Sequence, residues 1–115
     1  MLGITYYYQQ ITKLNTLKKR FVALQTALNA LLPDLRKASS FLNEAVDGMQ
    51  ASYTVNEVTA DNNSIKDNKK SIDDIISTIS GGVIPAIKQK IISIEAEISH
   101  YYELIRQAEA EEREG

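Results

Sequence analysis

Apolar residues recur along the first half of the chain at alternating steps of three and four residues. Every seventh residue from position 7 is apolar, namely Tyr7, Leu14, Phe21, Leu28, Leu35, Leu42 and Met49. Leu17, Leu24 and Leu31 repeat at the same interval three residues later. This heptad is typical of a helix that packs lengthwise on another helix, whereas a strand requires a period of two. The spacing therefore predicts one long helix.

A second helix is expected after the polar cluster Thr59–Ser64, whose short side chains compete for backbone hydrogen bonds and favour a turn. Ile65, Ile72, Ile75 and Ile79 follow one heptad register there, and the isoleucines from Ile84 onward follow another, shifted by two residues. The shift occurs at Gly81-Gly82. An apolar stripe can continue past such a shift only through a local break, an over- or underwound turn, or a bend.

These observations predict an all-α fold, a long antiparallel helical hairpin kinked near Pro33 and Gly81–Pro85. Its expected parts are arm one at about 6–57, a turn at about 58–63, arm two at about 64–111 and an acidic tail at 112–115, all in a single domain. Pro33 occupies a heptad position away from the seam, so its missing N–H favours a kink over a break. The alternative is a compact bundle in which Pro33 and Gly81-Gly82 are true chain reversals.

The apolar stripe is wider than two paired helices need. A two-stranded rod requires two apolar positions in each heptad, but Ile11, Leu32 and Val46 add a third row in arm one, and Ile76, Ile92 and Tyr102 lie beside the main seam of arm two. Such width is usual in bundles of three or four helices, although single exposed hydrophobic residues are also common. We expect the following residues to bind a partner: Ile11, Leu14, Leu17, Phe21, Leu24, Leu28, Leu32, Val46, Ile76, Ile92 and Tyr102.

Composition removes several other classes of function. The chain has 115 residues, no Cys and a net charge of −2, which excludes disulfide scaffolds and argues against a nucleic-acid binder. Its longest uncharged run, from Ile75 to Ile87, is too short for a membrane span of roughly 20 residues. The first eight residues lack the features of a cleavable signal, so we expect no Sec-type export. The acidic arm two complements the basic arm one, which favours antiparallel pairing.

The sequence contains few candidate residues for catalysis or metal binding. His100 is the single histidine, and its Glu97-x-x-His100 spacing is one half-motif where di-iron bundles use two together with further glutamates. The Asp61–Lys66 stretch has Lys66 where a calcium loop requires glycine. We therefore expect no enzyme activity, no cofactor and no metal.

Several segments resemble a known family. They are the Tyr-rich opening, the stretch from Ala45 to Asn56, and the block from Val83 to Ile91 that runs into Glu95-Ala96-Glu97-Ile98. In these the chain is similar to the small helical proteins encoded beside LXG-domain toxins of the type VII secretion system. The Val-Ile-Pro-Ala-Ile sequence after Gly81-Gly82 is the most distinctive part of the likeness.

The resemblance implies a non-enzymatic adaptor that binds the helical N-terminal domain of a cognate LXG toxin and assists its type VII export. It implies a cytoplasmic protein, with co-secretion and a second small helical partner left open. A homodimer in isolation is compatible with the same stripe. The alternative function is a self-assembling structural coiled-coil protein, such as a phage or surface component.

Overall fold

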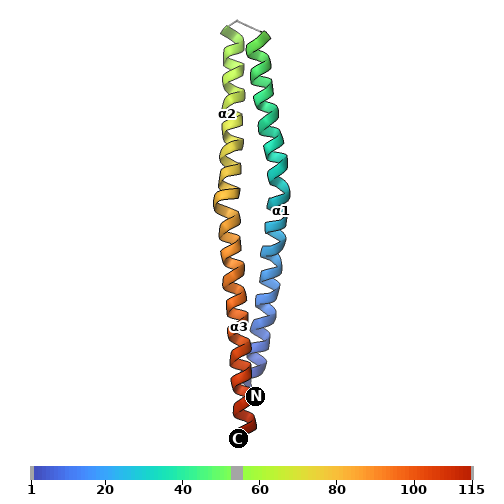
Figure 1. Cartoon of the computed structure of the whole chain (residues 1–115), viewed down its shortest axis with the longest axis vertical. Coiled ribbons are helices and arrows are strands. Elements are labelled where there is room, and N and C mark those ends of the chain that lie inside the picture. Colours follow the sequence, from blue (N-terminus) through green and yellow to red (C-terminus); the bar gives the residue numbers. More distant parts are fainter. Residues whose placement is uncertain (1, 53–55, 115) are drawn as a thin grey trace. The chain divides into compact units, whose positions relative to one another are not determined.

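The structure is a computed structural model that describes residues 2–52 and 56–114, with side chains described over 3–48 and 63–113. The chain is an all-α helical hairpin (Figure 1), and the described residues contain no strand. Its elements are α1 (Leu2–Ser52), α2 (Asn56–Thr78), the π-helical turn η1 (Ile79–Val83) and α3 (Ile84–Glu114). The predicted fold class is confirmed.

The helix boundaries differ from the predicted ones. α1 begins at Leu2 and ends at Ser52, and α2 begins at Asn56, so residues 58–63, where we expected the turn, are helical. Asn and Asp cost at most about 0.7 kcal/mol each relative to Ala in a helix, and this preference is too weak to end a helix by itself. Glu112 and Arg113 of the expected tail also belong to α3. Residues 53–55 lie outside the described part.

Pro33 lies inside α1, which continues through it. Its side chain is exposed, so the missing N–H and the ring lie away from the packed side of the helix, as predicted. α2, η1 and α3 likewise follow one another without a non-helical residue between them. The alternative of a compact bundle that reverses at Pro33 and at Gly81-Gly82 is therefore wrong.

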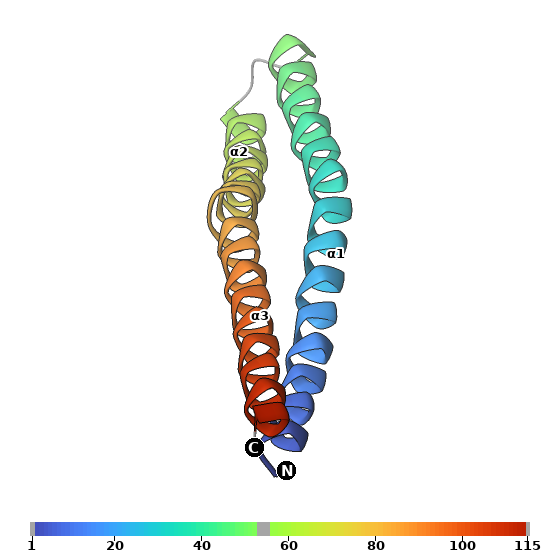
Figure 2. The same ribbon diagram turned by 60° about the horizontal axis from the view of Figure 1, so that its bottom comes forward.

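The chain divides into two compact units, of which the first combines Met1–Thr26 with Ala86–Gly115. In this unit the beginning of α1 lies antiparallel to α3, as two views show (Figures 1 and 2). The Tyr7 and Tyr101 ring centroids are 5.8 Å apart, and Lys18 Nζ lies 3.3 Å from Glu95 Oε1. Its core consists of isoleucines from both helices, Ile11, Ile87, Ile94 and Ile105.

The second unit, Ala27–Pro85, joins the rest of α1 to α2 and η1. Leu32 of α1 forms a core cluster with Ile79 and Ile84, the residues that begin and follow the π turn. Leu28, Leu35 and Ile76 pack around this cluster and are half-buried. The π turn thus lies next to the proline-containing part of α1.

The π turn accounts for a shift of register in arm two, which is one residue and not the two inferred from the sequence, because Ile76 packs in place of Ile75. The buried and half-buried positions step by three or four residues up to Ile79 and again from Ile84, but Ile79 and Ile84 are five apart. In η1 the Ile84 N–H donates to the Ile79 carbonyl, five residues back, so the turn holds one more residue than an α-helical turn. Of the three options left open by the sequence, the underwound turn is the one observed.

Glycine eases this turn but is not sterically required. A Cβ added at Gly81 or Gly82 would meet nothing within 4 Å, and no glycine among the described residues has a positive φ. The two glycines lower the preference of the segment for a regular α-helix by roughly 1 kcal/mol each. They make the inserted residue easier to accommodate without fixing its position.

Two isoleucines on α3 provide a test of the core. Ile94 is 1% exposed and Ile92 is 55% exposed. We expect Ile94→Ala to lower the free energy of unfolding by about 2–5 kcal/mol and Ile92→Ala to change it by less than about 0.5 kcal/mol, measured by urea denaturation followed by circular dichroism. Equal effects would show that the packed side of α3 is wrongly assigned.

Deletion of one residue tests the role of η1. Removing Gly82 should turn the π turn into a regular α-helical turn and restore a four-residue step between the flanking isoleucines, so the melting temperature should be unchanged or higher. Deletion of Ala96, an exposed residue within α3, is the control, because it rotates the rest of the helix by about 100° and should lower the melting temperature. A lower melting temperature for the Gly82 deletion than for the Ala96 deletion would contradict this role.

Candidate partner-binding surface

α1 carries three neighbouring heptad rows, and their burial differs. The central row, which the sequence placed at the seam, is half-buried from Tyr7 to Leu42. The inner row contains Ile4, Ile11, Lys18, Gln25, Leu32, Ser39 and Val46, all buried or half-buried. The outer row contains Leu17, Leu24, Leu31 and Ala38, which are exposed, and Gln10 and Ala45 near its ends, which are half-buried. The helix pair is therefore formed by the central and inner rows.

This arrangement corrects the predicted seam, which paired the central row with the outer row. The outer row would supply alanines at positions 38 and 45, whereas the inner row supplies Ser39 and Val46 at those heights, and both are buried. Two polar members of the inner row also find partners within their own units. Lys18 pairs with Glu95, and the Ser39 hydroxyl donates to Asp73 Oδ1 over 2.5 Å.

The first unit consequently exposes large leucines beside a half-covered row. Leu17 and Leu24 are 37% and 46% exposed. Their neighbours Leu14 and Phe21, three residues before each of them, are half-buried. A row that is covered on one side only can pack against a further helix without disturbing the existing pair.

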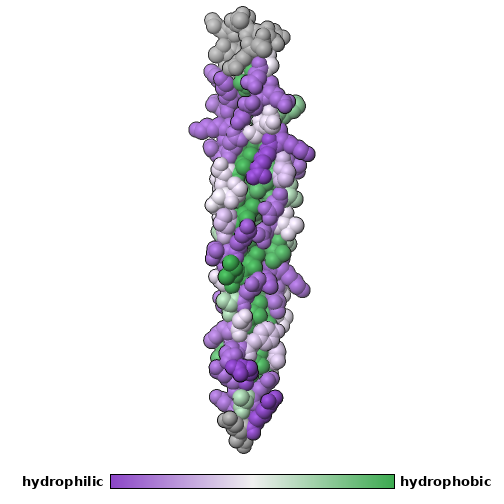
Figure 3. All heavy atoms as spheres, in the orientation of Figure 1, coloured by the Kyte–Doolittle hydropathy of each residue, from purple (hydrophilic) through white to green (hydrophobic). Residues whose placement is uncertain are grey.

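The second unit has its own exposed apolar side chains. Three of these lie one position before a residue of the core cluster or its surround, Leu32, Ile76 or Ile84. They are Leu31, Ile75 and Val83, which are 43%, 48% and 37% exposed. In an antiparallel helix pair, residues with this spacing lie on the same side of both helices. The space-filling view shows apolar side chains reaching the surface between polar margins (Figure 3). Ile75, which the sequence placed in the seam, is thus exposed, and Ile76 packs in its place.

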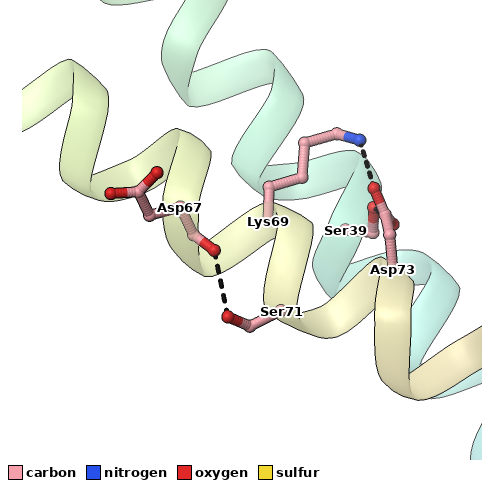
Figure 4. A network of polar contacts seen from close by, with 5 residues as sticks. All are labelled: Ser39, Asp67, Lys69, Ser71 and Asp73. Carbon is pink, nitrogen blue, oxygen red and sulfur yellow. Dashed lines mark hydrogen bonds and ion pairs between the residues drawn. The ribbon is translucent and has the colours of Figure 1, made fainter.

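Polar residues occupy another part of this unit. Lys69 Nζ donates to Asp73 Oδ2 over 2.7 Å, while Ser39 of α1 holds the other carboxylate oxygen (Figure 4). Ser39 is buried, so its hydroxyl requires this acceptor. The hydrogen bond from Lys69 and then that from Ser39 hold the pKa of Asp73 below its ordinary value, although partial burial opposes them. An open depression lined by Arg36 and Asn43 adjoins this network.

The eleven predicted partner-binding residues separate into three groups in the structure. Those buried in the chain's own helix pair are Ile11, Leu32 and Val46. Those that are half-buried are Leu14, Phe21, Leu28 and Ile76. Those that are exposed are Leu17, Leu24, Ile92 and Tyr102. The sequence analysis left exposed Leu31 out of the partner-binding residues, although Leu31 has the same heptad spacing as Leu17 and Leu24.

The described part of the chain brings together no cluster of side chains suited to catalysis or metal binding. No group of three His, Asp or Glu side chains there could hold a metal ion. His100 is exposed, and its ring lies 6.1 Å from that of the adjacent Tyr101. Over the described residues no helix combines the length and the apolar character that crossing a bilayer requires.

Comparisons with known proteins return no match: no protein family, no curated protein and no solved structure is significantly similar to this chain.

The network around Asp73 predicts a pH-dependent stability. Because folding lowers the pKa of Asp73, the ionised carboxylate stabilises the native state above the ordinary aspartate pKa of about 4, and this contribution is lost as the pH falls through the lower folded-state value. The difference in unfolding free energy between the wild type and Asp73→Asn should be largest near neutral pH and shrink below about pH 4. Urea denaturation at a series of pH values measures it.

Asp74→Asn is the matched control, because Asp74 is the exposed neighbour of Asp73 on the same helix. A difference between wild type and Asp73→Asn that stays constant down to acid pH would show that the Ser39 and Lys69 hydrogen bonds do not depend on the charge of Asp73.

Proposed function

We propose that this chain is a non-enzymatic helical adaptor that binds helices of another protein along α1. The observation that carries the proposal is the half-buried central row of α1 with exposed Leu17 and Leu24 beside it. Leucines repeated every seven residues on a helix surface are arranged as a second seam. Because Leu17 and Leu24 are already more than half covered, burying their remaining exposed surface against a partner contributes about 0.5–1.5 kcal/mol each. Isolated exposed hydrophobic residues would not share this spacing.

The partner that we propose is the helical N-terminal domain of an LXG-domain toxin, whose type VII export the adaptor would assist. Support comes from the sequence resemblance of the Tyr-rich opening and of the block from Val83 to Ile91 to small proteins encoded beside such toxins. The adaptor would act in the cytoplasm before export, alone or with a second small helical protein. The exposed leucines are compatible with this role because the proposed partner is itself helical.

Co-expression with the N-terminal region of an LXG toxin encoded by a neighbouring gene tests the proposal. We expect a complex of fixed stoichiometry that co-elutes on size exclusion and has a higher melting temperature than the isolated chain. A discrete homo-oligomer in sedimentation that ignores the toxin region would instead support the self-assembling coiled-coil alternative. A stable monomer that ignores that region would contradict both.

A charge placed at Leu24 should separate binding from folding. Leu24 is exposed in the isolated chain, so Leu24→Glu should leave the melting temperature nearly unchanged but abolish the complex, because burying an unpaired carboxylate at the interface costs several kcal/mol. Ala23→Glu adds the same charge at the preceding exposed position, about 100° around the helix, and should leave the complex intact. Retention of the complex by Leu24→Glu would show that binding does not use the outer row.

A further inference from the structure

The apolar surface of the first unit has a charge of one sign beside it. On α1, Lys13 precedes Leu17 by four residues and Arg20 follows it by three, so the three side chains lie on the same face of the helix. Leu24 continues this face four residues after Arg20. All four side chains are exposed, and the resulting row of Lys13, Leu17, Arg20 and Leu24 alternates basic and apolar residues. We call it the basic leucine row.

The charge of this row is not neutralised within the described structure. Residues 1–33 contain four basic side chains and no acidic one. Lys18 pairs with Glu95 of α3, but Lys13 and Arg20 form no ion pair with any described residue. On α3, the heptad positions beside the same row are filled by Lys90 and Glu97, one of each sign, so α3 adds no net negative charge there.

We propose that the basic leucine row is the docking site for an amphipathic helix whose leucines or isoleucines are flanked by Asp and Glu. The inference rests on the proposed function, since it concerns the helix that an adaptor would bind, and it specifies the chemistry of that helix. An apolar partner seam would cover Leu17 and Leu24, while carboxylates at its edges would pair with Lys13 and Arg20. The partner helix would then contact both the leucines and the basic residues of the row.

The charges favour this occupant over a second copy of the same row. Two copies packed row against row would bring four cations together over the length of three helical turns, which opposes association. A helix with acidic edges meets no such opposition. An anionic membrane surface could also attract leucine and basic side chains, and the experiment below treats it as a competing outcome.

Two synthetic helices serve as probes for the intact chain. Both carry leucine heptads of equal length, and the flanking positions are glutamate in one and lysine in the other. Fluorescence anisotropy of the labelled peptides should show that the chain binds the glutamate peptide about tenfold more tightly, since two interfacial ion pairs amount to about 1.4 kcal/mol. The preference should decrease on raising the salt concentration from about 0.05 M to about 0.5 M.

The variant pair assigns the preference to this face. Arg20→Glu should remove the preference for the glutamate peptide. Arg20→Gln should reduce the preference, and it serves as the test if Arg20→Glu destabilises the chain. Lys19→Glu makes the same change of charge at the adjacent exposed residue, which lines a different surface of α1 together with Asn15 and Val22, and should leave the preference intact. Melting curves confirm that each variant is folded.

Equal binding of the two peptides, binding of neither, or equal effects of the Arg20 and Lys19 reversals would each overturn the inference. So would binding to vesicles of anionic phospholipid in the absence of peptide binding.

The inference and the proposed function can fail separately. If the toxin N-terminal region binds wild type and Arg20→Glu equally well, the basic leucine row is not the docking site, although the adaptor role stands. If the toxin region does not bind but the glutamate peptide binds through Arg20, the row is a docking site and the named partner is wrong.

Discussion

The structure depends on the packing of heptad rows between α1 and the second arm. A helix pair closes only where both helices present side chains at steps of three and four residues, and α1 offers two overlapping ways to do so. The inner row is the one used, even though Lys18, Gln25 and Ser39 belong to it. Because that choice turns the leucines of the outer row toward the surface, the same interaction that forms the hairpin also creates the candidate partner-binding surface.

Much of the fold could be predicted because it follows from periodicity. The 3/4 spacing indicated two long helices, and the shift at Gly81-Gly82 indicated an irregular turn, which is the π turn η1. The position of the chain reversal could not be predicted in the same way. It was inferred from the short polar residues 59–64, but turn preference is a weak local effect, and residues 58–63 continue as helix.

The candidate site was predicted less well, for a related reason. A heptad shows which residues share a face but not where the neighbouring helix is centred on that face, and a shift of one row exchanges buried residues with exposed ones. Ile11 and Leu32 were expected at a partner interface and are buried within the chain, whereas Leu24 was expected at the centre of the seam and is exposed. The polar residues of the inner row made it look unsuited to the helix pair. That Lys18 and Ser39 would find acidic partners on the other helix is not evident from spacing alone.

The additional residue of η1 has a consequence for how such a chain can change over evolutionary time. In an ordinary helix, gaining or losing one residue rotates everything beyond it and disrupts the packing of all later turns. Here a local change in backbone hydrogen bonding absorbs the gain, while Ile79 and Ile84 remain in one cluster with Leu32. Length variation among homologous chains would therefore be best tolerated at this point, and an alignment gap of one position there would not imply a different architecture.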